Sequence, residues 1–165
     1  MNKTFAGSRA VRKPVVLLVD DDPEIHRLLD VKLCREDFAL VHALDADRAA
    51  EAMAASPALV LLDIRMPADR EGIEILRSIK KVRPELPVIM LSSRGEVETV
   101  VESLRCGAED FFHKPDLASS KKFAQLIERI RELAGRNERG DHGRRRCILI
   151  RDLRILSVKT SRSGI

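Results

Sequence analysis

The sequence predicts an α/β protein in which five parallel strands form a doubly wound sheet, with helices on both faces. Two features predict this fold. Short apolar runs rich in β-branched residues recur along the chain, and segments with helical periodicity separate them. Near-continuous apolar strands indicate a parallel sheet buried on both faces, and right-handed crossovers then distribute the helices over those faces. The expected strands are Val15 to Val19, Phe38 to Leu44, Leu59 to Leu62, Val88 to Leu91, and Phe111 with Phe112.

The first two helices have clear start signals. Asp22 is a capping residue, and Pro23 follows it at the first helical position. Asp45 can cap a second helix that runs through Ala55, with Pro57 just beyond it. The first helix should pack through one apolar face, which consists of Ile25, Leu28, Leu29 and Leu33.

The third and fourth helices are predicted from periodicity and from their stop signals. A helix is expected over Gly72 to Lys81, because apolar residues recur there at helical spacing before Pro84 ends the run. Another is expected over about Glu96 to Cys106, where Gly107 suits a left-handed cap. With one further helix, these complete five strand–helix units.

The last helix opens at either Asp116 or Ser119, and its apolar stripe ends at Leu133. Beyond that point the chain becomes polar and basic, and so short a segment rarely buries enough surface to fold alone. The expected organisation is therefore a flexible leader over 1–13, one domain over 14–134, and a basic linker or tail over 135–165 without a complete output domain.

Composition excludes several classes of function. No apolar run approaches the roughly 20 residues needed to span a bilayer. The three cysteines lack disulfide or metal spacing, which fits a cytoplasmic protein, and the absence of Trp and Tyr argues against stacking on single-stranded nucleic acid. Nine of the 30 basic residues but three of the 26 acidic ones lie in Arg136 to Ile165. Specific nucleic-acid binding is not expected from this tail, because phosphate contacts carry no sequence information.

Polar residues follow four of the five strands, at the edge where open parallel sheets bind ligands. Clustered carboxylates need a compensating cation, and oxygen ligands favour Mg²⁺, which also coordinates phosphate oxygens. A lysine adds positive charge for an anion, and a serine adds a hydrogen-bond donor. The set indicates a carboxylate that becomes an acyl phosphate. Its members are Asp20, Asp21 and Asp22 after the first strand, Asp63 after the third, Ser92 and Ser93 after the fourth, and Lys114 after the fifth.

Four segments resemble the receiver domain of two-component response regulators: Val15 to Pro23, Leu61 to Pro67, Leu86 to Ser93, and Phe111 to Pro115. The resemblance covers about Pro14 to Leu133 and implies the flavodoxin-like strand order 2-1-3-4-5. It also implies the role of each site residue. Asp63 matches the phosphoacceptor and a metal ligand, Asp20 and Asp21 the metal-binding acids, Arg65 a ligand through its backbone carbonyl, Ser92 the switch hydroxyl, Phe111 the switch aromatic, and Lys114 the phosphate-contacting lysine.

The resemblance implies a phosphorylation-dependent signalling switch. Such a protein accepts its phosphoryl group from a histidine kinase or a histidine phosphotransfer protein, in a reaction that depends on Mg²⁺. A downstream protein effector would bind the face formed by helix four, strand five and helix five, and no membrane partner is expected. The protein would not be an enzyme in the ordinary sense, because it would catalyse only its own phosphotransfer and dephosphorylation.

Simpler interpretations exist for several of these residues. Asp22 precedes a proline, which is the position of a helix cap. Asp20 and Asp21 are also compatible with acids near the positive end of a helix dipole. Four histidines lack a partner pattern and are interpreted as ordinary surface or partly buried residues: His26, His42, His113 and His142.

Two other functions compete with the receiver. A haloacid-dehalogenase-like phosphatase also follows its first strand with Asp-x-Asp, a pattern that Asp20 and Asp22 satisfy formally, although a helix begins here at once instead of the usual Gly-Thr turn. The second is a DNA-binding transcriptional regulator whose output domain is truncated or absent. The run Cys147 to Val158 reads as β-like rather than as a reader helix.

Overall fold

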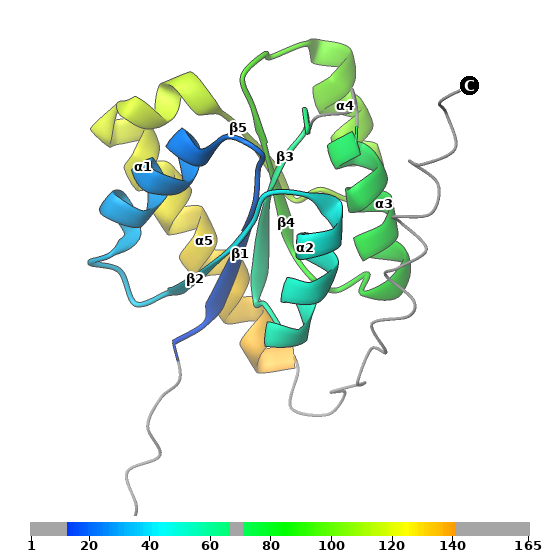
Figure 1. The fold of residues 1–165 in the computed structure, drawn as a ribbon, viewed down its shortest axis with the longest axis horizontal. Coiled ribbons are helices and arrows are strands. Elements are labelled where there is room, and N and C mark those ends of the chain that lie inside the picture. Colours follow the sequence, from blue (N-terminus) through cyan, green and yellow to red (C-terminus); the bar gives the residue numbers. More distant parts are fainter. Residues whose placement is uncertain (1–12, 67–70, 141–165) are drawn as a thin grey trace, which may run out of the picture.

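A computed structural model describes residues 13–66 and 71–140. Five parallel strands form one sheet in the order β2-β1-β3-β4-β5, and helices cover both of its faces (Figure 1). The predicted doubly wound fold and its strand order are therefore confirmed. Most of the predicted leader and tail lies outside the described residues. The strands are β1 (Val15–Val19), β2 (Ala39–Ala43), β3 (Leu59–Asp63), β4 (Val88–Ser92) and β5 (Asp110–His113), and the helices are α1 (Pro23–Leu33), α2 (Ala46–Ala52), α3 (Glu71–Val82), α4 (Val97–Arg105) and α5 (Ser120–Gly140).

The sheet separates two apolar clusters. In β1, Leu17 and Val19 belong to one cluster, whereas Val16 and Leu18 belong to the other, because successive side chains point to opposite faces. Helices α2, α3 and α4 lie on one side of the sheet, and α1 and α5 lie on the other (Figure 1). Burial on both faces is thus the physical reason that the strands are almost continuously apolar.

The helix ends follow the predicted capping residues. The Asp22 carboxylate accepts a hydrogen bond from the N–H of Glu24 at 2.9 Å, and the Asp45 carboxylate accepts one from the N–H of Arg48 at 2.7 Å. Gly107 follows α4 with φ of +98°, the left-handed conformation that glycine adopts without steric cost. These caps satisfy backbone groups that would otherwise have no partner at the helix ends.

The second helix is shorter than predicted. It ends at Ala52, and Met53–Ala55 forms a turn of 3₁₀-helix instead of a further α-helical turn. Ser56 then takes φ of +51°, which ends the element before Pro57. Tightening to 3₁₀ geometry is a common way for a helix to end.

The last helix begins at the later of its two predicted starts and continues further than its apolar stripe. A 3₁₀-helix, Lys114–Ala118, follows β5, and α5 starts at Ser120, immediately after Ser119. Pro115 lies in the first turn of the 3₁₀-helix, where its fixed φ is compatible with the turn. The helix α5 extends to Gly140, past the end of the apolar stripe. None of the described helices is long and apolar enough to cross a membrane.

Gly72 allows α3 to begin directly against the end of β3. A Cβ atom at this position would lie 1.9 Å from the main-chain oxygen of Asp63 and 2.7 Å from the Cα of Ile64. Both are backbone atoms, which cannot move aside without displacing the strand. The absence of a side chain at Gly72 therefore keeps the last residue of β3, Asp63, in its position.

We expect Gly72→Ala to lower the free energy of unfolding by about 1–3 kcal/mol, because the new methyl group forces β3 and α3 apart. Urea denaturation measures the change. Gly135→Ala is the matched control, since a Cβ there meets nothing within 4 Å, and in a helix this change should stabilise the protein by about 0.5–1 kcal/mol. Equal effects of the two substitutions would contradict the close approach at Gly72.

Candidate functional site

The carboxyl ends of the strands bring four of the predicted site residues to one edge of the sheet. Asp20 follows β1, Asp63 is the last residue of β3, Ser92 is the last residue of β4, and Lys114 follows β5. Because all five strands are parallel, these ends meet at the same edge. All four residues are buried despite their polarity.

The lysine joins the two buried acids. Lys114 Nζ lies 2.7 Å from Asp20 Oδ2 and 2.7 Å from Asp63 Oδ2. Two carboxylates thus share one ammonium group in a place that is almost closed to water. Buried charges require compensation, and this arrangement compensates them only in part.

Each carboxylate also accepts a hydrogen bond from the chain that follows it. Asp20 Oδ1 accepts from the N–H of Asp22 at 2.9 Å, and Asp63 Oδ1 accepts from the N–H of Arg65 at 3.2 Å. Asp20 Oδ2 is buried and has no hydrogen bond of ordinary geometry, so its contact with Lys114 is an ion pair. The Lys114 ammonium group is therefore the only partner of this oxygen among the described residues.

Burial dominates the electrostatics of the site. It raises the pKa of Asp20 above its ordinary value, against the opposing effect of Lys114. Burial raises the pKa of Asp63 as well, again against Lys114, and the negative charge of Asp20 adds to the rise. Burial disfavours the charge of Lys114, but hydrogen bonds and attraction to the two carboxylates together raise its pKa. The acids are therefore short of positive charge.

A third carboxylate completes an oxygen-rich group. Asp21 is exposed, and one carboxylate oxygen from each of Asp20, Asp21 and Asp63 lies within 4.8 Å of the others. Hard divalent cations prefer oxygen ligands, and Mg²⁺ uses few protein carboxylates while keeping several waters. The donor set, the buried Asp20 Oδ2 without a hydrogen bond and the deficit of positive charge all fit such an ion.

Each of the other predicted site residues has its own contacts in the structure. The Ser92 hydroxyl donates to the carbonyl of Arg94 at 2.5 Å and accepts from the N–H of Arg94 at 3.1 Å, so it is engaged with its own loop. Phe111 is half-buried and packs against the apolar cluster that includes Leu17 and Val19. Arg65 lies two residues after the end of β3, and its N–H donates a hydrogen bond to the carboxylate of Asp63. The carboxylate of Asp22 caps α1, as predicted.

Three histidines have partners that their sequence pattern does not indicate. His113 contacts the main-chain oxygen of Ser93 at 3.1 Å, and the other two are His26 and His42. His26 is buried, and its Nε2 lies 2.7 Å from the main-chain oxygen of Asp20. Its Nδ1 lies 2.7 Å from Nδ1 of His42, whose Nε2 lies 3.0 Å from Asp30 Oδ1. His26 is therefore not an ordinary surface or partly buried residue.

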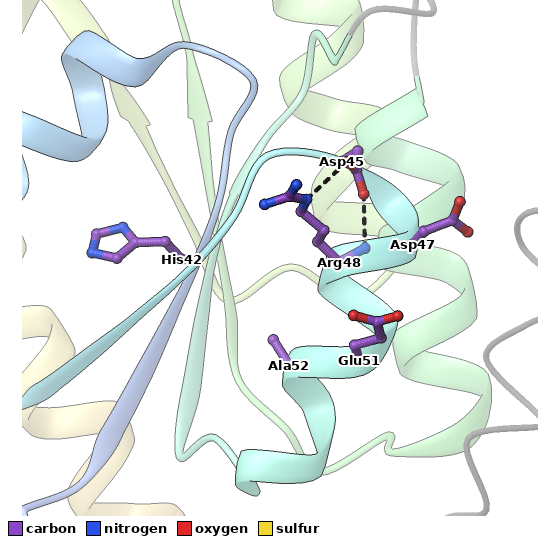
Figure 2. Close-up of a pocket in the computed structure, with 6 residues that line it drawn as sticks. All are labelled: His42, Asp45, Asp47, Arg48, Glu51 and Ala52. Atoms are coloured by element: carbon purple, nitrogen blue, oxygen red, sulfur yellow. Dashed lines mark hydrogen bonds and ion pairs between the residues drawn. The ribbon is translucent and has the colours of Figure 1, made fainter.

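A separate pocket of about 660 Å³ opens beside β2 and α2 (Figure 2). Asp45, Asp47, Arg48 and Glu51 line it, and Asp45 and Arg48 are engaged with each other in the cap of α2. None of the acids of the sheet edge lines this pocket, so we assign it no part in the site.

Comparison with known proteins shows the family of the chain. The family model described as the response regulator receiver domain matches residues 16–130. The chain belongs to the response-regulator receiver family. The receiver domain of NtrX from Brucella abortus is a similar solved structure, with a TM-score of 0.63 and 39% identity over 71% of this chain and 98% of that one. The chain is thus similar to a receiver in both sequence and fold.

Curated relatives of this receiver are longer regulators. The nitrogen assimilation regulatory protein NtrX from Azorhizobium caulinodans is 43% identical over 102 residues, which make up 61% of this chain and 22% of that protein. The response regulator protein PilR from Pseudomonas aeruginosa is 34% identical over 117 residues, 70% of this chain and 26% of that protein. The receiver therefore spans about a quarter of the length of these relatives.

We expect Asp63→Asn to raise the free energy of unfolding of the metal-free receiver at pH 7 by on the order of 1 kcal/mol. The folded-state pKa of Asp63 is raised above 3.8, so the stability this group contributes is fully present below pH 3.8 and is lost as pH rises through the raised value. Urea denaturation with a chelator measures the difference, which should shrink toward pH 3.8. Asp37→Asn, at an exposed acid, is the control. A less stable Asp63→Asn variant at pH 7 would contradict this account.

Proposed function

We propose that this chain is a phosphorylation-dependent signalling switch that accepts a phosphoryl group on Asp63 from a histidine kinase or a histidine phosphotransfer protein. The observation that carries the proposal is the pair of buried carboxylates, Asp20 and Asp63, that share Lys114 at the carboxyl edge of the sheet. Membership of the receiver family supports the same function.

Mg²⁺ is the proposed cofactor. Asp20, Asp21 and Asp63 would hold it through their carboxylates, and Arg65 through its backbone carbonyl. The grouping of three carboxylate oxygens and the buried Asp20 Oδ2, which has an ion pair with Lys114 but no hydrogen bond, support this assignment. When bound, the ion supplies positive charge that neutralises the oxygens of a phosphoryl group during transfer.

The proposed reaction is a transfer between two proteins. A carboxylate oxygen of Asp63 attacks the phosphorus of a phosphohistidine on the donor. A P–O bond forms and the P–N bond breaks, with its electron pair going to the imidazole nitrogen, which takes up a proton from solvent. Lys114 stabilises the negative charge of the phosphoryl oxygens, because its ammonium group already lies beside Asp63. The chain catalyses only this transfer and the later hydrolysis of its own acyl phosphate.

The proposed switch begins at Ser92. Its hydroxyl bonds to the main chain of Arg94, so it must leave this turn to donate to a phosphoryl oxygen on Asp63. Phosphorylation would then shift an equilibrium between the two positions of the hydroxyl, and Phe111 would follow. The effector is proposed to bind the face formed by α4, β5 and α5, where Val97, Val101 and Leu104 are exposed on α4.

The phosphatase alternative is not favoured by the geometry. It requires Asp20 and Asp22 to act together, whereas the Asp22 carboxylate is used as the cap of α1. The basic tail is proposed to lack sequence-specific nucleic-acid binding, and nearly all of it lies outside the described residues. A cytoplasmic location is part of the proposal, as it is where phosphotransfer from a kinase to a receiver would take place.

We expect acetyl phosphate with Mg²⁺ to add the mass of one phosphoryl group to the full chain, as measured by intact-mass spectrometry. Asp63→Asn and excess chelator should each abolish the addition, because the reaction needs both the nucleophile and the metal charge. Asp22→Asn is the control and should still be phosphorylated, since this acid caps a helix. Labelling of Asp20 with Asp63 unmodified would favour the phosphatase instead.

We expect Ser92→Ala and Lys114→Ala to impair the phosphorylation-induced change more than they impair Mg²⁺ binding, because both groups act on phosphoryl oxygens. Amide NMR shifts of α4 and Phe111 report the change in the wild-type chain, and Mg²⁺ titration reports metal binding. Ser93→Ala, at the exposed neighbouring hydroxyl, is the matched control. Unchanged shifts in α4 on phosphorylation of the wild type would contradict the proposed switch.

A further inference from the structure

His26 lies on α1 and faces the backbone of the acidic group. The residue is 7% exposed, and its Nε2 lies 2.7 Å from the main-chain oxygen of Asp20. This oxygen belongs to the peptide bond that joins Asp20 to Asp21, the two acids that follow β1. A contact that fixes this peptide plane therefore sets the direction of both side chains.

The partners of the two histidines determine where the hydrogens lie. A main-chain oxygen only accepts, so His26 Nε2 carries a hydrogen and donates it to Asp20. A neutral His26 with its hydrogen on Nε2 accepts at Nδ1, so His42 is the donor in the 2.7 Å contact between the two Nδ1 atoms. Nε2 of His42 lies 3.0 Å from Asp30 Oδ1. Figure 2 shows His42 projecting from β2 away from α2. The contacts with the Asp20 carbonyl and with His42 thus hold the imidazole of His26 in one tautomer and orientation.

Asp20 is held at every polar group except one. Its N–H donates to the carbonyl of Ala43 in β2 at 3.0 Å, its carbonyl accepts from His26, and its Oδ1 accepts from the N–H of Asp22. Only Oδ2 has no hydrogen bond, and it points to Lys114 and the acidic group. His26 thus supplies one of three hydrogen bonds that hold Asp20 while its Oδ2 faces Lys114 and the acidic group.

We propose that His26 is a positioning residue for the Mg²⁺ site, acting through its hydrogen bond to the Asp20–Asp21 peptide. This inference rests on the proposed function, since it assigns His26 to the metal that phosphotransfer to Asp63 requires. A purely structural histidine would tie α1 to β2 and affect the stability of the fold. A positioning histidine also affects the affinity for the ion.

Two conservative substitutions separate these roles. In His26→Gln, the amide nitrogen occupies the place of Nε2, so donation to the Asp20 carbonyl is retained. In His26→Asn, the shorter amide occupies the place of Nδ1, so the partnership with His42 is retained and donation to Asp20 is lost. Both replacements are polar and smaller than histidine. Leu33→Ala, on the buried face at the far end of α1, is the control for loss of stability alone.

The experiment is a Mg²⁺ titration of the full chain followed by amide NMR, with urea denaturation to confirm that each variant is folded. We expect His26→Asn to bind Mg²⁺ about tenfold more weakly than the wild type, and His26→Gln to stay within about twofold. Leu33→Ala should lose stability and keep its affinity. Initial phosphorylation rates of His26→Asn should recover toward the wild-type rate at saturating Mg²⁺.

Equal affinities of the Asn and Gln variants, whether both are unchanged or both are weakened, would overturn this inference while leaving the proposed function intact. A loss of affinity in Leu33→Ala as large as that in His26→Asn would also overturn it, because stability alone would then explain the effect. If the wild-type chain itself does not bind Mg²⁺, the proposed function fails, and this inference fails with it.

Discussion

The structure depends on two buried carboxylates that share one ammonium group. Asp20 and Asp63 lie at the ends of neighbouring strands, and Lys114 contacts both. Such a group costs folding free energy, because charge is removed from water and only partly compensated. Burial causes this cost, and it also raises the pKa values of both acids. A divalent cation and a phosphoryl dianion are the two ligands that would change this balance of charge, in opposite directions.

The rest of the fold supplies the rigidity that such a group requires. Two apolar clusters pack against the two faces of the sheet, so the strand ends have fixed positions. Gly72 allows α3 to begin directly against Asp63, and Asp22 caps α1 just beyond the first acids. In the proposed account the His26–His42 relay adds a restraint on the peptide that joins Asp20 to Asp21. The stability of the apolar core thus offsets the cost of the acidic edge.

Much of the fold was predictable from the sequence, because apolar runs buried on both faces mark the strands unambiguously. Asp20, Asp63 and Lys114 were found together because they follow strands of one parallel sheet. Three features were not predictable. One partner of His26 is His42 on β2, and no short-range sequence pattern indicates such a contact. The turn formed by Ser92 with Arg94 depends on loop conformation. The part of α5 between Leu133 and Gly140 lacks apolar periodicity, the pattern that indicates a helix in a sequence.

We propose that the acidic edge lacks positive charge and that Mg²⁺ supplies it. The most direct test is the free energy of unfolding of the wild-type chain, measured by urea denaturation over a range of Mg²⁺ concentrations at constant ionic strength. Above the dissociation constant, stability should rise by about 1.4 kcal/mol for each tenfold increase in Mg²⁺. Stability that is independent of Mg²⁺, or that rises equally when Na⁺ replaces it, would contradict the account.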